Sequence, residues 1–516
     1  MKIIIPMSGL GKRFVAAGYT DPKPLIQVDG QPIIKHIIDL FPGETEIHCI
    51  CNRGHIETTN MRSVLEGYGA IVHVIEPHTL GPVFAALQIA DLIADYEEII
   101  VSYCDYGTVW DYSAFLKQVR ETQVDGAIAA YRGFHPHMLG TDNYAFLRLK
   151  EDGSVAEVRE KEPFTDNRMD EYASNGTHYF RYGADIKRYF QELIDLGIQK
   201  NGEYYVSLVY NLLLRDAKKV DVFEIQKMLQ WGTPKDLSEY QMWSDHFRKA
   251  VEPQTSCESS ATLILPLAGR GSRFLMNGFT VPKPLLDING KSMIIRAVES
   301  IPQCKSQTFI CLKEHMATYP LEKTLTGEFS GSRVIGIDEV TEGQACTCEI
   351  GLQGIDPATP ILISACDNGV DYDKEAYLRL ENDPTIDVIV WSFTNNPTGQ
   401  LYPHMYAWLD IDASNNIKYV SVKKPLPGAS HAIIGTMFFR TASLYLKGLK
   451  EIYEKQIRTN GEFYVDNLLN PLIEAGYKVK VFPVDAYICW GTPNDYKTYQ
   501  YWLEHFSKQW GCPRLM

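Results

Sequence analysis

The chain contains one motif twice, and this repetition limits what it can fold into. A segment that begins at Pro6 returns 260 residues later at Pro266, and twelve of the twenty-five positions in the windows 6–30 and 266–290 are identical. Later segments recur at offsets between 259 and 262. A chain of 516 residues is also longer than one hydrophobic core normally supports. The repeat therefore predicts two domains of the same fold.

Short apolar strands alternate with helical stretches in both halves, which is typical of an α/β fold with a mostly parallel mixed sheet. The expected strands cover 2–6, 46–51, 71–75 and 98–104 in the first half and 262–266, 307–312, 333–337 and 360–366 in the second, with helices such as 82–95 and 344–354 between them. The segment 250–260 is polar and lacks apolar periodicity, so it is interpreted as a linker. The predicted domains are therefore 1–249 and 261–516.

The composition limits the partners that the chain can bind. Its formal net charge is −14, which argues against nucleic acid and anionic membrane surfaces as partners. No apolar run approaches the ~20 residues of a membrane-spanning helix. The eleven cysteines lack zinc-ligand spacing and are expected to be reduced thiols, which indicates a cytoplasmic protein. The oligomeric state is left open, with a homo-oligomer as one alternative.

A glycine turn and two cations form the repeated motif. The first strand of each half runs into Gly-x-Gly, which leaves backbone N–H groups accessible to an anion. An arginine follows two residues later, and a lysine between two prolines follows ten residues after the arginine. Two cations beside a bare backbone turn suit a triphosphate, and the alternative is a tight turn with surface cations. The residues are Gly9, Gly11, Arg13 and Lys23 in the first half and Gly269, Gly271, Arg273 and Lys283 in the second.

The two motif sets resemble the nucleotidyltransferase (nucleoside-diphosphate-sugar pyrophosphorylase) superfamily. The resemblance is carried by Gly-x-Gly-x-Arg-Phe, Pro-Lys-Pro-Leu, an aspartate that ends a strand and a Gly-Thr-x-Tyr/Phe-Phe stretch in each half. The opening motif is similar to that of members found in capsule and lipopolysaccharide gene clusters. The resemblance implies two tandem Rossmann-like (GT-A-like) domains. It also implies a Mg²⁺-dependent reaction that joins a nucleoside triphosphate to a sugar 1-phosphate, or a similar phosphorylated small molecule, and releases pyrophosphate.

An aspartate at the end of an apolar strand is the expected magnesium ligand of each half. Asp105 and Asp367 come where a parallel strand delivers its carboxyl end to a ligand crevice, and a hard carboxylate suits Mg²⁺. The resemblance assigns both the metal-binding role, and the alternative is an aspartate that caps the following turn. Many family members carry a second aspartate two residues before the glycine of the late Gly-Thr motif. Here those positions are Gln230 and Cys489, so the alternatives are a single carboxylate or help from Asp236 and Asp495 or from Glu203 and Glu462.

The remaining site residues follow from the same resemblance. It implies that Gly81 and Gly343 bind the nucleotide and that Lys161, Gly176 and Glu203, with Lys423, Gly435 and Glu462, bind the acceptor; Lys424 is an alternative to Lys423. Five residues before the turns at Gly81 and Gly343, this chain has Glu76 and Asp338. Because a carboxylate only accepts hydrogen bonds, these two residues favour CTP or GTP over UTP or dTTP.

Other functions remain open on the sequence alone. One half could be catalytic and the other degenerate. Ser8 and Lys12, in place of the more typical Ala268 and Ser272, favour the first half as the degenerate one, whereas its intact Glu-Lys element at 160–161 favours the opposite, so both alternatives stay open. A cytidylyltransferase acting on a non-sugar phosphate or phosphonate would use the same motifs. A nucleotide-sugar-dependent glycosyltransferase would share the sheet and the aspartate but would need no cradle for pyrophosphate. A non-catalytic scaffold would have little reason to hold two such cradles.

Overall fold

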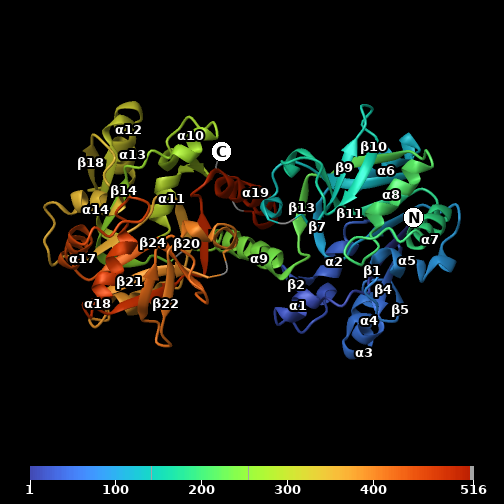
Figure 1. Ribbon diagram of the computed structural model, residues 1–516, viewed down its shortest axis with the longest axis horizontal. Coiled ribbons are helices and arrows are strands. Elements are labelled where there is room, and N and C mark those ends of the chain that lie inside the picture. The colour runs from blue at the N-terminus through green and yellow to red at the C-terminus, as the bar shows by residue number, and fades with distance from the viewer. Residues whose placement is uncertain (141, 254, 395, 512–516) are drawn as a thin grey trace. The chain divides into compact units, whose positions relative to one another are not determined.

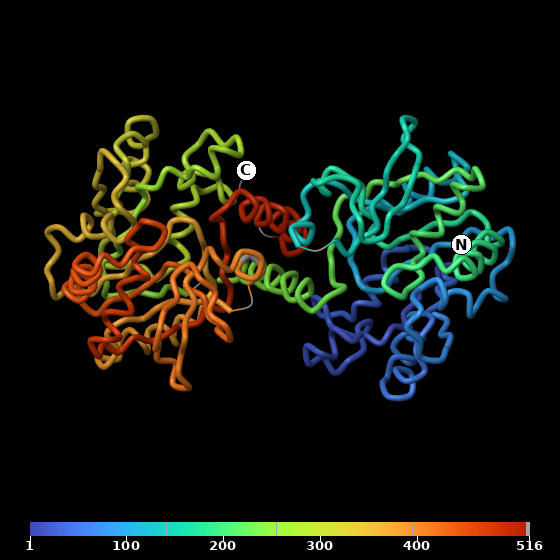
Figure 2. Tube along the Cα trace, viewed as in Figure 1, coloured from blue at the N-terminus to red at the C-terminus, as the bar shows by residue number. Residues whose placement is uncertain are grey.

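The chain divides into two compact units, Met1–Gln241 and Met242–Met516, and the division falls inside helix α9 (Pro234–Lys249) (Figures 1 and 2). A computed structural model describes residues 1–140, 142–253, 255–394 and 396–511. The expected linker 250–260 stays a prediction, and its residue 254 lies outside the described residues, as do 512–516 of the second expected domain. Strand β14 (Glu258–Leu267) begins within the expected linker.

Unit 1, Met1–Gln241, is built on a mixed sheet. Its strands are β1 (Lys2–Met7), β2 (Gln27–Val28), β3 (Gln31–Pro32), β4 (Glu46–Asn52), β5 (Ile71–Ile75), β6 (Ile99–Ser102), β7 (Tyr106–Val109), β8 (Gly126–Tyr131), β9 (Ala145–Leu149), β10 (Val155–Glu160), β11 (Tyr172–Phe180), β12 (Val220–Glu224) and β13 (Lys227–Gln230). Its helices are α1 (Lys12–Ala16), α2 (Ile33–Ile38), α3 (Arg53–Thr58), α4 (Met61–Gly67), α5 (Pro82–Leu87), α6 (Tyr112–Thr122), α7 (Gly183–Asp195), α8 (Val206–Arg215) and the start of α9.

Strand β1 lies at the centre of this sheet, which has nine strands within the described residues. All six of its residues, Lys-Ile-Ile-Ile-Pro-Met, are buried, as expected for a strand covered on both faces. It pairs in parallel with β4 and β6, and β4 pairs in parallel with β5. Strand β11 then runs antiparallel to β6, β8 and β9. The carboxyl ends of β1 and β6 therefore lie side by side, next to the middle of β11.

Helices α5, α7 and α8 pack on one face of the sheet of unit 1. Helix α7 buries Ile186, Tyr189, Phe190 and Leu193, which recur at the i, i+3, i+4, i+7 spacing of one helix face. Each such buried side chain stabilises the unit by roughly 1.5–3 kcal/mol. This apolar layer fixes the sheet edge at which the loops after β1 and β6 meet.

Unit 2 repeats the strand pairings of unit 1. Its strands are β14, β15 (Asp287–Ile288), β16 (Lys291–Ser292), β17 (Gln303–Leu312), β18 (Arg333–Ile337), β19 (Ile361–Ile363), β20 (Asn368–Asp371), β21 (Val388–Phe393), β22 (Trp408–Ile411), β23 (Ile417–Ser421), β24 (His431–Phe439), β25 (Val479–Pro483) and β26 (Ala486–Cys489). Strand β14 pairs in parallel with β17 and β19, and β24 runs antiparallel to β19, β21 and β22. These pairings match those of β1 and β11 one for one.

The helices of unit 2 follow the same order along the chain as those of unit 1. They are α10 (Ser272–Met276), α11 (Met293–Glu299), α12 (Lys313–Thr318), α13 (Leu321–Glu328), α14 (Gln344–Leu352), α15 (Lys374–Glu381), α16 (Pro397–Leu401), α17 (Ala442–Glu454), α18 (Leu469–Glu474) and α19 (Pro493–Trp510). Among the described helices of either unit, none is long and apolar enough to cross a membrane.

One expected helix is shorter than its apolar pattern indicates. The stretch 82–95 is helical only as α5 and as a 3₁₀ turn at Ala90–Leu92. The beginning of α7 presses against the rest, because a Cβ atom on Gly183 would lie 2.1 Å from the carbonyl oxygen of Ala94. A tertiary contact therefore overrides helix propensity here. The strand expected at 98–104 likewise ends at Ser102, and Asp105 lies in the turn before β7.

Candidate active site

The glycine turn of each unit follows its central strand. Gly11 and Gly271 lie at the N-terminal ends of α1 and α10 with φ of +61°, a left-handed conformation that glycine adopts without strain. Gly9 and Gly269 have open space where a Cβ atom would be. No described atom therefore covers the Cβ side of Gly9 or Gly269, and ligand binding at the two turns stays a prediction.

The lysine and the aspartate singled out by sequence are bonded to each other in both units. Lys23 donates from Nζ to Oδ2 of Asp105 at 2.8 Å. Lys283 donates to Oδ2 of Asp367 and, at 3.2 Å, to the carbonyl oxygen of Gly491. Both lysines begin a 3₁₀ turn, and the preceding proline holds an extended backbone. The flanking prolines therefore direct each ammonium group at the carboxylate in the turn after the neighbouring strand.

Burial and pairing act in opposite directions on these groups. Burial alone would lower the pKa of Lys23 and of Lys283, but the carboxylates of Asp105 and Asp367 outweigh it and raise both pKa values. Burial would raise the pKa of Asp367, but the Lys283 ammonium outweighs it and lowers that pKa. The pair in unit 2 is therefore ionised at neutral pH. Removing one partner of such a pair leaves an uncompensated charge, at a cost of about 3–5 kcal/mol where burial is complete.

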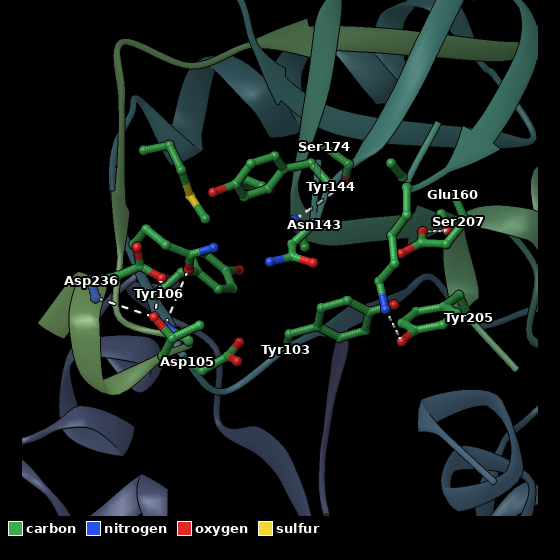
Figure 3. A pocket seen from close by; sticks show the side chains of 18 of the residues that line it. Tyr103, Asp105, Tyr106, Asn143, Tyr144, Glu160, Ser174, Tyr205, Ser207 and Asp236 are labelled. Carbon is green, nitrogen blue, oxygen red and sulfur yellow. Dashed lines mark hydrogen bonds between the residues drawn. The ribbon is translucent and has the colours of Figure 1, made fainter. Parts of the chain in front are cut away.

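Unit 1 has a cavity of about 160 Å³ beside this pair. Figure 3 shows Asp105 and Asp236 at one end and Glu160, Ser207 and Tyr205 at the other. The lining comes from the turn after β6, the end of β10, the middle of β11, strand β13 and the starts of α8 and α9. Of the residues predicted from sequence, Arg13, Asp105, Lys161 and Gly176 line it, and Lys23 reaches it through Asp105.

The two lysines expected to bind the acceptor share an unusual backbone. Lys161 has φ of +56° and Lys423 has φ of +57°, a conformation that non-glycine residues rarely adopt and that concentrates at functional sites. The counterpart of Lys161 in backbone conformation is thus Lys423 rather than Lys424. The Lys161 ammonium lies 4.4 Å from the ring centroid of Tyr205, and the Lys423 ammonium lies 5.2 Å from that of Tyr464. Burial lowers the pKa of Lys423.

The predicted acceptor-side glutamates act on these tyrosines. The Tyr205 hydroxyl donates to Glu203 and accepts from Lys161. In unit 2, burial and then the Glu462 carboxylate, which is hydrogen-bonded to the hydroxyl, raise the pKa of Tyr464. Each glutamate therefore holds the tyrosine over which Lys161 or Lys423 lies.

The glycines assigned to the nucleotide turn have a packing role in the structure. A Cβ atom on Gly81 would lie 2.8 Å from the backbone nitrogen of Tyr204, and one on Gly343 would lie 2.5 Å from that of Phe463. Gly176 has φ of +100°, and its Cβ atom would lie 3.0 Å from the Tyr103 ring. Gly435 has φ of +92°. Gly81 and Gly343 thus let the turn before α5 or α14 press against the segment that carries Glu203 or Glu462.

The acidic residues expected to read the base are exposed and paired. Glu76 accepts from Nε of Arg53 at 2.6 Å, and its side chain is 73% exposed. Asp338 accepts from Lys313 at 2.9 Å, and its side chain is 80% exposed. Each acid therefore faces solvent beside a basic residue, and Glu76 is outside the set that lines the cavity of unit 1. Exposed pairs of this kind contribute only ~0–1 kcal/mol to stability, so they can exchange partners easily.

The positions expected to hold a second metal ligand differ between the units. A Cβ atom on Gly232 would lie 3.0 Å from Oδ2 of Asp105 and 3.2 Å from Oε1 of Gln230, so two hard oxygen atoms meet there. In unit 2, the equivalent point on Gly491 lies 3.4 Å from both Asp367 Oδ2 and Cys489 Sγ and 3.9 Å from Oδ2 of Asp495. Burial raises the pKa of Cys489 far above its ordinary value, so this sulfur is a neutral thiol.

The alternative metal ligands already have partners. Asp236 accepts from the Thr233 hydroxyl at 2.6 Å and Asp495 from that of Thr492 at 2.6 Å, which caps α9 and α19. The described part of the chain holds no group of three His, Cys, Asp or Glu side chains that could bind a metal ion. Asp105 with Gln230 fits Mg²⁺ that takes its other ligands from phosphate and water. In unit 2, Asp367 and Asp495 both offer oxygen to Mg²⁺, but the Cys489 thiol beside them is a poorer neighbour for an ion that prefers oxygen.

The residue before Lys161 is a buried acid in the wall of the cavity, and its burial was not among the sequence predictions. Glu160 is 7% exposed and accepts from the Ser207 hydroxyl at 2.6 Å. Burial raises its pKa to about 7. The alternation along β10 buries Val158 and Glu160 on the same face, and this pattern is the signal that could have identified it.

No known protein-family model matches this sequence. Solved structures with a similar fold include a nucleoside-diphosphate-sugar pyrophosphorylase from Vibrio cholerae RC9, with 22% identity and a TM-score of 0.38 over 46% of this chain and 99% of that one. A candidate glucose-1-phosphate thymidylyltransferase from Bacillus anthracis, in complex with a sucrose, has 16% identity and a TM-score of 0.38 over 47% of this chain and 94% of its own. The inositol-1-phosphate CTP transferase from T. maritima has 14% identity and a TM-score of 0.38 over 48% and 98%. These similarities concern the fold, and each spans about half of this chain.

The buried Glu160 carboxyl should make the stability of unit 1 depend on pH. Because its folded pKa is about 7 and its unfolded pKa is about 4.3, the folded state holds the proton between these values. Stability should therefore fall as pH rises through this window. Glu160→Gln removes the titrating group, so its free energy of unfolding relative to wild type should be larger at about pH 8 than at about pH 5. This difference between the two pH values should be roughly 3 kcal/mol at most.

Urea unfolding of the full chain at both pH values measures this difference. The matched control is Glu157→Gln on the same strand, where the glutamate pairs with Arg159 at the surface. An equal effect of Glu160→Gln at both pH values would show that this carboxyl titrates normally.

Proposed function

We propose that each unit transfers a nucleotidyl group from a nucleoside triphosphate to a phosphorylated small molecule and releases pyrophosphate. The observation that carries this proposal is the Lys–Asp pair beside an accessible glycine turn, built once in each unit. A triphosphate carries a charge near −4, and cations with free backbone N–H groups can offset its desolvation. The matching strand pairings and motifs support two copies of one nucleotidyltransferase domain. The proposed product is a precursor of a surface polysaccharide, with a sugar 1-phosphate as acceptor.

The proposed reaction is an in-line attack of an acceptor phosphate oxygen on the α-phosphorus. Positioning and charge stabilisation supply the catalysis, without a covalent enzyme intermediate. The glycine turn and Arg13 hold the leaving pyrophosphate, Lys23 stabilises charge on the α-phosphate, and Lys161 places the nucleophile. Their counterparts in unit 2 are Gly269, Gly271, Arg273, Lys283 and Lys423.

Magnesium belongs to the proposal as a bound cofactor. Asp105 with Gln230 would hold it in unit 1 and Asp367 would hold it in unit 2. When bound, Mg²⁺ neutralises phosphate charge, which lets the phosphates approach the carboxylate. Lys23 and Lys283 already lie at those carboxylates, so each ammonium can move from the carboxylate to a phosphate as the nucleotide enters.

A second candidate is that only one unit turns over. The neutral thiol of Cys489 stands where unit 1 has the oxygen of Gln230, and this favours unit 2 as the weaker catalyst. In that case unit 2 would bind ligand without reaction. Variants that silence one unit at a time distinguish the two candidates.

Replacing either paired lysine should silence its own unit. Lys23→Ala and Lys283→Ala each remove an ammonium group that is directed at the site, and loss of one such group typically costs on the order of 10²–10³ in rate. Pyrophosphate release from CTP, GTP, UTP and dTTP with a panel of phosphorylated acceptors measures the effect.

Lys117→Ala and Lys450→Ala are matched controls, because both lysines lie on exposed helix faces. They should retain wild-type rates. Full activity in both single variants and in the double variant of Lys23 and Lys283 would disprove the assigned role.

The carboxylates of Glu76 and Asp338 should set the choice of base. They accept hydrogen bonds, which suits the amino group of cytosine or the N1–H and N2–H₂ edge of guanine. Wild type should use CTP or GTP at least about tenfold better than UTP or dTTP, since one lost hydrogen bond to a charged group costs roughly 1.5–3 kcal/mol. The double variant Glu76→Gln, Asp338→Asn should lose this preference.

The control for the base experiment is Glu57→Gln, which removes the other carboxylate near Arg53 and should leave the preference intact. Rates with the four triphosphates at fixed acceptor concentration give the comparison. Equal turnover of all four by wild type would rule out the assignment of these two acids.

A further inference from the structure

The two units differ in the side chains that face the acceptor lysine. Strand register establishes the correspondence: Glu160 pairs with Ala145 and His178 with Val101 in unit 1, while Met437 pairs with Ile363 in unit 2. The offsets of the lysines and of the Gly-Thr motifs agree with it. On this basis Asn143, Glu160, Ser174 and His178 correspond to Met405, Val422, Ile433 and Met437.

The wall of the cavity in unit 1 is polar. Glu160 and Ser207 are bonded to each other at 2.6 Å, and Nε2 of His178 lies 3.4 Å from Oγ of Ser174. Figure 3 shows Asn143, Ser174, Glu160 and Ser207 around one space. These groups offer donors and acceptors from three directions. They can therefore bond several hydroxyl groups of one ligand.

The corresponding wall of unit 2 is apolar. Ile433 and Met437 are 4% and 1% exposed and belong to one hydrophobic cluster, on which Val422 packs. The sulfur of Met405 lies 4.0 Å from Nη1 of Arg273, and its carbonyl oxygen accepts from the Lys423 ammonium. Met405 therefore lies beside both the pyrophosphate arginine and the acceptor lysine. A hydroxyl group placed here would lose its bonds to water without replacement.

The buried acid near the acceptor lysine has also changed its position. Unit 1 has Glu160 on strand β10 and Ser207 on α8, whereas unit 2 has Val422 and Asp466 at these places. Burial raises the pKa of Asp466, and the nearby Lys423 ammonium partly offsets this rise. Unit 2 thus keeps one carboxyl as a counter-charge for its lysine and presents an apolar strand to the acceptor.

From these differences, and resting on the proposed function, we propose that the two units use acceptors of different chemistry. Unit 1 takes a phosphate carried by a polyhydroxylated group, such as a sugar ring. Unit 2 takes a phosphate carried by an apolar group with few or no hydroxyls. The shared lysines, Lys161 and Lys423, bind the phosphate that both acceptors have in common.

Two probes of equal ring size test this proposal: glucose 1-phosphate, which has hydroxyls around the ring, and cyclohexyl phosphate, which has none. The full chain carrying Lys283→Ala reports on unit 1, and the chain carrying Lys23→Ala reports on unit 2. A site built to bond hydroxyls rejects an analogue that lacks them by about 10⁴-fold, and an apolar site disfavours added hydroxyls by about 10²-fold. Pyrophosphate release with each of the four triphosphates gives kcat/KM for both probes.

The two units are expected to rank the two probes in opposite order. Unit 1 should prefer glucose 1-phosphate by at least about 10²-fold, and unit 2 should prefer cyclohexyl phosphate by at least about tenfold. The same ranking in both single-unit forms, or no release from unit 2 with either probe, would overturn this proposal while the proposed function stands. No release by the unsubstituted chain with either probe would likewise overturn this proposal, and no release with any acceptor of the panel would overturn the proposed function as well.

A double substitution that moves the buried acid of unit 2 to the position it has in unit 1 supplies a second, independent measurement. In the Lys23→Ala chain, Val422→Glu with Asp466→Ser rebuilds the Glu160–Ser207 arrangement in unit 2. This variant should gain at least about tenfold in kcat/KM for glucose 1-phosphate relative to cyclohexyl phosphate, about the value of one hydrogen bond to a charged group. Binding of glucose 1-phosphate, measured by calorimetry on the same chain, should tighten in parallel. An unchanged ratio in a variant with wild-type circular dichroism would contradict the proposed role of this wall.

Discussion

The pairing of a lysine that begins a 3₁₀ turn with an aspartate that follows a strand of the sheet determines how each unit can act. Lys23 and Asp105, like Lys283 and Asp367, are partly buried and neutralise each other, so each unit can hold a cation and an anion at the same place without ligand. Because the pair is partly removed from water, each charge depends on the other as its partner. Deleting one of them would leave the other without a counter-charge. A nucleotide that brings phosphate and magnesium together offers new partners to both groups at once.

The topology of the sheet explains why these residues meet. Strands β1 and β6 are parallel neighbours, so the glycine turn after β1 and the aspartate after β6 emerge at one edge. Strand β11 lies antiparallel to β6 and places Gly176 beside them, with the Tyr103 N–H bonded to the Gly176 carbonyl at 3.0 Å. Ligand sites of α/β sheets form at such carboxyl edges. The same three strand positions recur in unit 2, while the surrounding side chains have diverged.

The sequence predicts the shared parts of the site better than the parts that differ. Arg13, Lys23 and Asp105 were recognisable because the motif and its spacing occur twice. The packing role of Gly81 depends on the distant Tyr204 backbone, and the early end of the helix after Pro82 depends on Gly183; neither contact leaves a local pattern. Glu160 lay within a pattern that could be read, since a single acid alternates with valines on a buried strand face. Ser207 and Ser174 add polar groups to the same cavity wall. The sequence does not predict this, because the three residues lie on separate segments that only the fold brings together.

The most direct test of this account is a crystal structure of the full chain with Mg²⁺ and a non-hydrolysable CTP or GTP analogue. The account predicts a triphosphate on the Gly9–Gly11 turn or its counterpart at Gly269–Gly271, with the ammonium of Lys23 or Lys283 moved from its aspartate to a phosphate oxygen. At saturating ligand, both turns without nucleotide and both Lys–Asp pairs intact would contradict it.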